Sequence, residues 1–600
     1  MSTLPFDETT DFEDADRGLI GSLVPAVVKT DDGRVVWDND AYAFLDGDCP
    51  DTANPSLWRQ SQLCAKQGLY EVMDGFYQVR GLDLSNMTLV EGDEGVIVID
   101  PLVSKETAAA ALVLYRTHRG DRPVTAVIYT HAHVDHFGGV RGVYRDGIPI
   151  VAAHGFMEAA VAENVYAGGA MNRRAEYMYG AKLPKGPRGQ IGAGLGQTNS
   201  TGAIGVIPPT TEITHTGQEE TLDGVLIRFQ MTPGTECPVE MNFLFPEHRA
   251  LCMAENATHN LHNLLTLRGA VVRDARIWSY YLNEAIGLFA GDTDVAFASH
   301  HWPTWGRDRV VTYLSQQRDL YAYLHDQTLR LMNAGYTGIE IAEMIEMPPA
   351  LEAAWHTHGY YGSVSHNVKA IYQRYLGWFD GNPAHLWQHP PVEAATRYVD
   401  AFGGADVVLA KARGYIDGGD LRFAAELLNH VVFADDTNTT ARDLLADVYE
   451  TLGFGAENGT WRNFYLQGAE ELRNGVSALA VDLAGATDVV NALTIEQIFD
   501  SVAIRVNGPK AWAEHLTIDW NVTDAGRTYR TELTNGVLIQ RVDPQDGTAD
   551  LTVTLIKPQL LAMLAGAGLD GMATEGDLAT ISRLLAVLDP PAGAFAIVTP

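Results

Sequence analysis

The stretch THAHVDHFGG, residues 130–139, decides both the fold and the chemistry that the chain can support. Within six positions it holds three imidazoles and one carboxylate, from His131, His133, Asp135 and His136. The preceding residues 124–129 are rich in β-branched side chains and predict a buried strand that delivers these groups to a sheet edge. Histidines on an exposed loop are the simpler alternative, but H-x-H-x-D-H directly after a buried strand favours metal ligands. The stretch therefore predicts a metal-dependent hydrolase.

A site for two metal ions needs more ligands than these four, and three further candidates follow a turn or a short apolar run. Glu236 follows the turn-forming Pro-Gly of TPGTE, Glu255 follows the run ALCMA, and His300 follows the run VAFAS. Each of them alone could be an ordinary exposed chain end. Their joint appearance in this order along the chain favours one shared site.

The H-x-H-x-D-H pattern, together with the apolar run VIVIDP at residues 96–101, resembles the metallo-β-lactamase superfamily. This resemblance implies an α/β catalytic domain built as an αββα sandwich, which periodicity alone does not predict. It also implies that Asp100, at the end of the apolar run, supports one of the metal ligands.

Glu236 and Glu255 stand where most members of that superfamily carry His and Asp. With AENATHNLHNLLTLRGA (254–270), SHHWPTWG (299–306) and YYGSVSHNVKAIYQRYLGWFDGNP (360–383), they resemble the zinc-dependent alkylsulfatases of the linear primary type, over nearly the whole chain. The resemblance implies two Zn²⁺ per subunit. One zinc would be held by His131, His133 and Glu236, the other by Asp135, His136 and His300, and Glu255 would bridge the two.

A sulfate monoester is a diffuse anion, so its binding calls for a fixed guanidinium and neutral donors. By resemblance, Arg268 is the main sulfate clamp, helped by Asn263 and His262. A structural alternative is that Asn263 caps a helix and Arg268 pairs with Asp274. Tyr179, in GGAMNRRAEYMYG, is a further candidate for the substrate pocket.

Other residues of that segment, Arg173, Arg174 and Tyr177, could also line the pocket, although paired arginines on a helix usually face solvent. For catalysis we expect His366, Glu255 and Asp135 to act directly. Two zinc ions sharing a water molecule would lower its pKa towards about 7. His366 resembles the general acid that protonates the departing alkoxide. The sequence leaves open whether the S–O or the C–O bond breaks.

The resemblance implies hydrolysis of linear primary alkyl sulfate esters such as dodecyl sulfate, a detergent. Alternatives that stay open are a secondary alkylsulfatase that inverts the carbon, and an ester, lactone or thioester hydrolase of the same fold. From another class, the chain could be a lipid-binding assembly module with an idle metal site. Free sulfate as a product separates these classes.

The net charge of −34 excludes a nucleic-acid surface and disfavours binding to anionic membranes. Four cysteines, Cys49, Cys64, Cys237 and Cys252, form no C-x-x-C pair and predict no disulfide framework. We see no secretory signal in MSTLPFDETTDFEDADRG and no run of membrane-spanning length, so we expect no stable membrane anchor. A cytoplasmic location follows, with secreted or periplasmic locations less favoured.

Six hundred residues predict several domains. We place the catalytic domain with an N-terminal extension at residues 1–315. Helical spacing and a capping box at 337–340 then predict an all-α domain at 316–468. This domain could brace the catalytic unit or bury its face on a second subunit, and the resemblance favours the second role, a homodimer. Alternating residues at 516–522 and 551–555, with an Asn535-Gly536 turn, predict an α+β domain at 469–600. This last part resembles a sterol-carrier-like domain that binds the alkyl chain.

Overall fold

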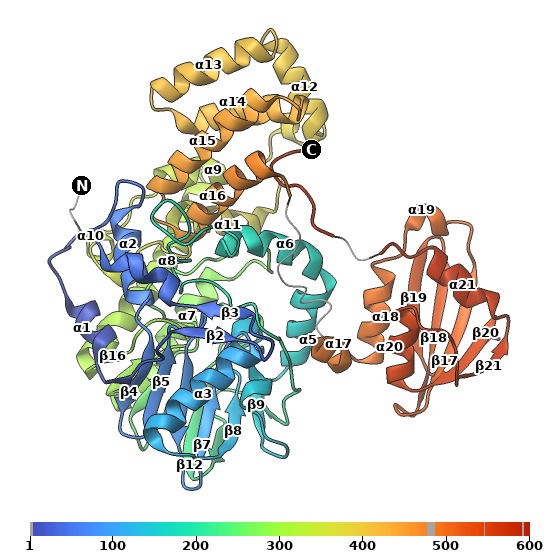
Figure 1. The fold of residues 1–600 in the computed structure, drawn as a ribbon, viewed down its shortest axis with the longest axis horizontal. Coiled ribbons are helices and arrows are strands. Elements are labelled where there is room, and N and C mark those ends of the chain that lie inside the picture. The colour runs from blue at the N-terminus through green and yellow to red at the C-terminus, as the bar shows by residue number, and fades with distance from the viewer. Residues whose placement is uncertain (1–3, 477–486, 545–546, 591–592) are drawn as a thin grey trace. The chain divides into compact units, whose positions relative to one another are not determined.

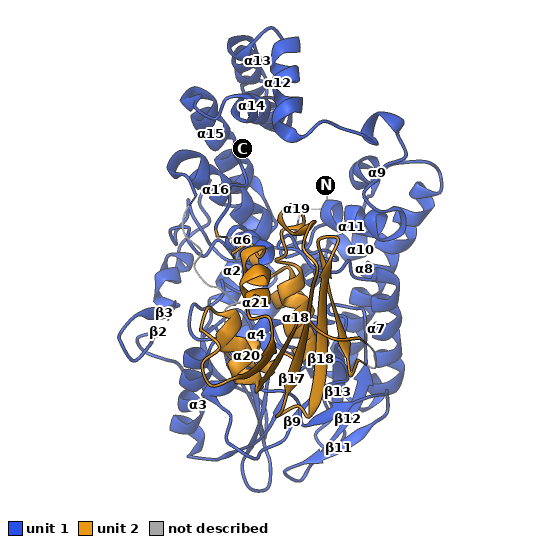
Figure 2. Ribbon diagram, turned by 90° about the vertical axis from the view of Figure 1, so that its right-hand side faces the viewer, with its two compact units in different colours: residues 1–160, 170–481, 594–600 blue, residues 161–169, 482–593 orange. Residues whose placement is uncertain are grey.

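The computed structural model describes residues 4–476, 487–544, 547–590 and 593–600. The chain forms two compact units, which Figure 2 shows in different colours. Unit 1 comprises residues 1–160, 170–481 and 594–600, and unit 2 comprises residues 161–169 and 482–593. In the described part of the chain, no helix is both long and apolar enough to cross a membrane. Residues 1–3 of the acidic N-terminal stretch lie outside the described residues.

Unit 1 contains two large β-sheets (Figure 1). The eight-stranded sheet has the order β1 (Leu19–Gly21), β4 (Gly68–Met73), β5 (Phe76–Arg80), β6 (Met87–Glu91), β7 (Val96–Ile99), β8 (Val124–Ile128), β9 (Ile150–Ala153) and β10 (Thr211–Ile213). The six-stranded sheet has the order β11 (Glu219–Leu222), β12 (Val225–Met231), β13 (Met241–Phe245), β14 (Ala250–Cys252), β15 (Val295–Phe297) and β16 (Thr304–Trp305). Strands β7 to β10 run parallel, and so do β14 and β15. The strand predicted at 124–129 is confirmed as β8, and the apolar run at 96–101 contains β7.

A shared apolar core lies between the two sheets. Phe76 of β5 meets Phe245 of β13 at a centroid distance of 4.9 Å, and Phe297 of β15 packs against both rings. Ile97, Ile99 and Ile128 and the inward residues of β12 and β13 belong to the same buried cluster. Since alternate residues of a strand face opposite sides, the other half of each strand must be covered by helices.

Helices cover the outer faces of both sheets. On the eight-stranded sheet lies α3 (Lys105–Arg119), whose Tyr115 packs against Tyr77 of β5 at a centroid distance of 5.7 Å. On the six-stranded sheet lie α7 (Ala275–Phe289) and α8 (Arg307–Met332), which bury Trp278 and Leu314 with Leu251 of β14. This is the predicted αββα sandwich.

Shorter elements complete the sandwich and join it to the rest of the chain. The helices are α1 (Thr10–Asp16), α2 (Pro55–Cys64), α4 (Val134–Phe137), α5 (Phe156–Val161) and α6 (Gly168–Tyr179). A small two-stranded sheet pairs β2 (Val27–Lys29) with β3 (Val35–Asp38). Short 3₁₀ helices are η1 (Asp40–Asp46), η2 (Val140–Gly142), η4 (Ala290–Asp292), η5 (Trp355–Thr357) and η6 (Pro383–His385). The segment η3 (Ala162–Tyr166) is a π-helix and belongs to unit 2.

A helical region follows the sandwich within unit 1. Its members after α8 are α9 (Gly338–Met344), α10 (Pro349–Glu352), α11 (Val364–Leu376), α12 (Pro391–Ala401), α13 (Ala405–Asp417), α14 (Leu421–Ala434), α15 (Thr439–Gly455) and α16 (Gly459–Asn474). The capping box of Thr337 and Glu340 at α9 is confirmed. The divisions that we placed after residues 315 and 468 fall inside α8 and α16, where a continuous helix carries the chain across each of them.

Unit 2 is a five-stranded sheet with helices. The strand order is β19 (Val537–Val542), β18 (Arg527–Thr534), β17 (Leu516–Val522), β20 (Leu551–Leu555) and β21 (Ala573–Gly576). The helices are α17 (Thr487–Ala492), α18 (Ile495–Ala503), α19 (Gly508–Ala511), α20 (Lys557–Leu564) and α21 (Ala579–Ala586). Asn535 and Gly536, with φ of 53° and 75°, form the predicted hairpin turn. The predicted alternation is confirmed, and the inward residues join one packed core.

Residues 594–600 return to unit 1. The buried guanidinium of Arg173 in α6 donates to the carbonyl of Phe595 at 2.8 Å and also pairs with Glu471 of α16. The amide of Ile597 donates to Glu471 at 2.9 Å, and Val598 enters the core of the helical region. Arg173 is therefore a buried structural residue and does not face solvent.

The two units should respond separately to core mutations. Trp520 of β17 is 1% exposed and donates to Thr531 at 2.9 Å, so Trp520→Ala should lower the unfolding free energy of unit 2 by about 3–5 kcal/mol. Calorimetry should show a transition moved to lower temperature while the remaining transition and the metal content stay as in the wild type. Ile539→Ala, at a residue 55% exposed, is the matched control and should change little. Equal destabilisation by both variants would contradict the packed core of unit 2.

Candidate metal centre

The ends of strands from both sheets bring seven ionisable side chains together. His131 follows β8 of the eight-stranded sheet, Glu236 follows β12, and Glu255 and His300 follow β14 and β15 of the six-stranded sheet. The ligand atoms form two groups in which all atoms lie within 4.8 Å of one another: His131, His133, Glu236 and Glu255, and Asp135, His136, Glu255 and His300. These are the two sets expected from the sequence, and Glu255 belongs to both.

Glu255 lies at the centre of the cluster. Its Oε2 is 3.1 Å from His136 Nε2, 3.2 Å from His300 Nε2 and 3.4 Å from His131 Nε2. On the side of the first group, Glu236 Oε2 lies 2.7 Å from His133 Nδ1. One carboxylate oxygen thus faces imidazoles of both groups, as a ligand shared by two cations must.

The donor set fits divalent metal ions. His136 Nε2, His300 Nε2 and Glu236 Oε2 are buried and have no hydrogen-bond partner among the described residues. Buried polar atoms normally have such a partner, so atoms left without one and aimed at a common point indicate a ligand. Imidazole nitrogen and carboxylate oxygen suit zinc, manganese or iron.

Asp100 orients the histidine cluster from behind. Its carboxylate accepts hydrogen bonds from the amide of Thr130 at 2.8 Å, the hydroxyl of Ser299 at 2.6 Å and His136 Nδ1 at 2.9 Å. With Nδ1 donating to Asp100, the lone pair of His136 Nε2 points toward the centre. The supporting role that the resemblance implied for Asp100 is confirmed.

Arg273 is a site residue that the sequence reading missed. It is 5% exposed and pairs with Glu236 Oε1, while its Nε donates to the Glu236 carbonyl at 2.5 Å. Burial alone would raise the pKa of Glu236, but Arg273 and then His133 hold it well below its usual value. Arg273 therefore keeps Glu236 charged and leaves only its Oε2 facing the cluster. The available signal was an arginine directly before Asp274, the N-cap of α7.

Glu240 was missed as well. Its carboxylate accepts from the amide of Glu255 at 3.0 Å, the amide of Glu236 at 3.2 Å and the hydroxyl of Thr235 at 2.7 Å. Burial raises its pKa to about 7. Glu240 thus ties together the two loops that carry the glutamate ligands. A lone acidic residue at the start of the apolar strand β13 was the signal for it.

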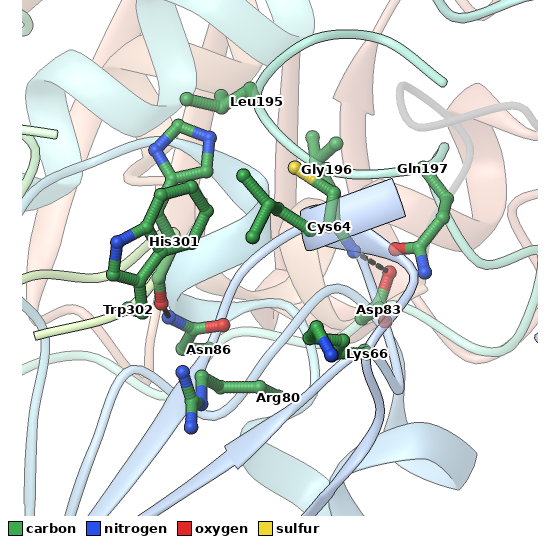
Figure 3. Close-up of a pocket in the computed structure, with 13 residues that line it drawn as sticks. Cys64, Lys66, Arg80, Asp83, Asn86, Leu195, Gly196, Gln197, His301 and Trp302 are labelled. Atoms are coloured by element: carbon green, nitrogen blue, oxygen red, sulfur yellow. Dashed lines mark hydrogen bonds between the residues drawn. The ribbon is translucent and has the colours of Figure 1, made fainter. Parts of the chain in front are cut away.

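A short turn supports the second group from the other side. The carbonyl of Leu84 lies 3.1 Å from His300 Nδ1, and the hydroxyl of Ser85 donates to the carbonyl of Asp135 at 2.5 Å. The amide of Leu84 donates to the carboxylate of Asp83 at 2.9 Å, and Asn86 donates to the carbonyl of His301 at 2.6 Å. Figure 3 shows Asp83, Asn86 and His301 around a pocket. The pocket encloses a cavity of about 20 Å³. The cavity has room for about one water molecule.

The residues expected to bind substrate lie on the loop after Glu255 and near it. His262 Nε2 is 2.8 Å from Glu255 Oε1, so this histidine orients the shared carboxylate. Asn263 caps no helix; its side-chain oxygen instead accepts from Arg273. Tyr179 shares a hydrogen bond of 2.8 Å with the hydroxyl of Tyr361, whose ring packs on His262.

Arg268 is half-buried, and its Nη1 donates to the carbonyl of Gly269 at 3.1 Å. The alternative interpretation gave Arg268 the carboxylate of Asp274 as its partner. Asp274 caps α7 and pairs with Arg374 at 2.9 Å.

His366 lies at the N-terminal end of α11 with both ring nitrogens engaged. Its Nε2 is 2.5 Å from the carbonyl of Leu265, and its Nδ1 accepts from the indole N–H of Trp461 at 3.3 Å. Burial lowers its pKa to about 4, so the ring is neutral at pH 7 and carries its proton on Nε2. Arg174 lines a cavity together with His366, and Tyr177 packs among the helices against Phe464.

Comparisons with known proteins agree with this architecture. Family models match at residues 80–300 (metallo-beta-lactamase superfamily), 337–475 (alkyl sulfatase dimerisation) and 483–600 (alkyl sulfatase C-terminal). A linear primary-alkylsulfatase of Pseudomonas sp. is 49% identical, covering 100% of this chain and 91% of that protein. An (R)-specific secondary-alkylsulfatase of Pseudomonas sp. is 45% identical over 100% and 92%. The solved structure of a stereoselective inverting sec-alkylsulfatase from Pseudomonas sp. superposes with a TM-score of 0.96 at 45% identity, covering 100% of this chain and 96% of that one.

The shared position of Glu255 predicts different metal losses for two variants. Glu255→Ala should weaken both metal positions, because it removes a ligand from each group, whereas His300→Ala should leave the group of His131, His133 and Glu236 able to hold one ion. Elemental analysis of the purified variants measures this, with His215→Ala, at an exposed histidine outside the cluster, as the control. A His300→Ala protein that retains no more metal than Glu255→Ala would show that the two groups are not separable.

Proposed function

The chain belongs to the alkylsulfatase family of the metallo-β-lactamase superfamily, and we propose that it hydrolyses linear primary alkyl sulfate esters, such as dodecyl sulfate, to alcohol and sulfate. The observation that carries the proposal is the buried cluster in which Glu255 is shared by two complete ligand groups. The full-length similarity to a linear primary-alkylsulfatase supports the choice of substrate.

In this proposal two Zn²⁺ ions occupy the cluster. His131, His133 and Glu236 would hold one ion, Asp135, His136 and His300 would hold the other, and Glu255, which belongs to both groups, would serve both ions. Bound there, the ions would supply Lewis-acid activation of a water molecule. The contribution of the chain is to fix the ligands before substrate arrives: Asp100 sets the tautomer of His136, and Arg273 and Glu240 hold the two glutamates.

Binding of the sulfate group is assigned to Arg268 and Asn263, with His262 and Tyr179 beside them. Arg268 supplies a delocalised cation with several donors, which suits a diffuse anion. Arg273 donates a hydrogen bond to the side-chain oxygen of Asn263. The side-chain nitrogen of Asn263, Nδ2, is buried and has no hydrogen-bond partner among the described residues. That nitrogen is therefore a free donor for an acceptor oxygen such as those of sulfate.

We propose that His366 donates the proton that the alcohol needs when it leaves. The neutral ring holds one proton, on the nitrogen that faces the carbonyl of Leu265. Donation of that proton to the leaving oxygen requires His366 to exchange this contact for the substrate. Such a proton matters if the S–O bond breaks and much less if the C–O bond breaks, since hydrogen sulfate leaves readily.

The second candidate is a secondary alkylsulfatase, favoured by the 45% identity to an (R)-specific enzyme and to an inverting one of known structure. For either function we propose a homodimer through the helical region. Trp378 and Trp387, which are 75% and 96% exposed there, support this contact. Sedimentation of the purified chain tests it, and a monomer at micromolar concentration would contradict it.

The function is tested by comparing 1-octyl sulfate with 2-octyl sulfate in ¹⁸O-labelled water. We expect free sulfate from the metal-loaded protein, with a higher kcat/KM for the primary ester. Label in sulfate identifies S–O cleavage, and label in the alcohol identifies C–O cleavage. If 2-octyl sulfate is preferred and gives inverted 2-octanol, the chain is a secondary alkylsulfatase and not a primary one. If the metal-loaded protein releases no sulfate from either ester, the proposed function is wrong.

Two variants should separate sulfate binding from proton transfer. Arg268→Ala should raise KM about ten-fold or more, because a charge-assisted contact contributes about 1.5–3 kcal/mol, while Arg276→Ala on the exposed face of α7 should not. If the S–O bond breaks, His366→Ala should slow alkyl sulfates, which are poor leaving groups, far more than a nitrophenyl sulfate. Equal slowing of both substrates would argue against proton donation by His366.

A further inference from the structure

A cavity of about 630 Å³ lies within unit 1, apart from the seven clustered ligands. Its walls come from α6, the loop 265–270, α11 and α16. A cavity of this size is in the range that holds a small organic molecule.

Two cations line this cavity, Arg174 of α6 and Lys369 of α11. None of the described residues that line it is an aspartate or glutamate. Lys369 Nζ donates to the hydroxyl of Ser365 at 3.1 Å and lies 6.0 Å from the centre of the Trp461 ring. Both cationic side chains are exposed, and partial desolvation lowers the pKa of each. In a chain with a net charge of −34, this is a local positive site.

The remaining wall is largely apolar. Leu265 and Leu267 of the loop face the cavity together with Trp461 and Phe464 of α16. A positive site beside an aliphatic and aromatic wall matches a molecule with an anionic head and a hydrocarbon chain. A free inorganic anion would leave the apolar wall unused, and a neutral lipid would leave the cations unused.

One loop joins this cavity to the metal centre. His262 bonds to Glu255, and two residues further on the amide of Leu264 donates to Asn367 of α11 at 3.0 Å. Asn367 in turn donates to the carbonyl of His262 at 2.9 Å. The next residue, Leu265, already lines the cavity. The loop therefore has the shared glutamate on one side and the cavity on the other.

We propose that this cavity is the capture site for the amphiphilic sulfate ester, in which Arg174 and Lys369 attract the anionic head and the wall of Leu267, Trp461 and Phe464 takes the hydrocarbon chain. The inference rests on the proposed function and adds to it two residues that act on binding and take no part in the chemical step. Their charge offsets the repulsion that a strongly acidic protein exerts on an anionic substrate.

The test uses the metal-loaded, full-length protein with Arg174→Gln, Lys369→Gln and the double variant. Binding is measured by calorimetry with dodecane-1-sulfonate, whose carbon–sulfur bond is not hydrolysed, and turnover with dodecyl sulfate below its micelle concentration at several salt concentrations. We expect the double variant to bind the sulfonate about ten-fold more weakly, to raise KM similarly with kcat unchanged, and to flatten the salt dependence of kcat/KM.

Matched controls remove the same charge elsewhere: Lys105→Gln and Arg307→Gln, at exposed residues of α3 and α8, should behave as the wild type. Arg174→Lys and Lys369→Arg keep the charge and should retain affinity, so a loss caused by misfolding is recognised. Unchanged sulfonate affinity in the double variant, or a fall in kcat with affinity intact, would overturn the proposal. A wild-type protein that binds the sulfonate through these residues but releases no sulfate would overturn the proposed function alone.

Discussion

The structure depends on burying several carboxylates close together while compensating the repulsion between their negative charges. Glu236 and Glu255 are each 3% exposed and lie in one cluster with Asp135. Burying an ionised carboxylate is costly unless counter-charges and donors compensate it. Imidazoles provide part of this compensation, and Arg273 provides a permanent positive charge against Glu236. The sandwich makes this possible because strand ends from both sheets reach the same edge.

The loop that follows Glu255 serves two purposes at once. Its first part fixes the shared carboxylate through His262, and its later part forms the wall of the large cavity from Leu265 onward. Asn367 of α11 holds the turn between the two parts through both its amide oxygen and its amide nitrogen. A helix outside the sandwich therefore contributes to the geometry of the metal centre, which links the helical region to catalysis as well as to assembly.

The resemblance to the metallo-β-lactamase superfamily and to the alkylsulfatases predicted the sandwich and the grouping of the seven clustered residues. The strands at residues 96–99 and 124–128 were recognisable from the sequence itself, because a run of apolar, β-branched residues is a local signal. The roles of Arg273 and Glu240 were not predicted, because each depends on burial and on a partner far along the chain. Arg273 pairs with Glu236, 37 residues away, and Glu240 accepts from the amide of Glu255, 15 residues away, and no local sequence pattern indicates either contact. Asn263 could not be assigned from sequence for the same reason, since its partner Arg273 was unrecognised. A change of hydrophobic pattern along the sequence does not locate the ends of a helix, so the divisions that we placed after residues 315 and 468 fall inside α8 and α16.

The return of residues 594–600 to unit 1 makes residues 482–593 an insertion within it. During synthesis on the ribosome, α6 and α16 emerge long before the segment that completes their contact. Glu471 receives the amide of Ile597, and Val598 fills the neighbouring core, only after the whole inserted sheet has been translated. Unit 1 therefore cannot complete its packing until residues 594–600 have been synthesised, so a nascent chain that stalls within the insertion leaves the Glu471 carboxylate and the neighbouring core without these contacts.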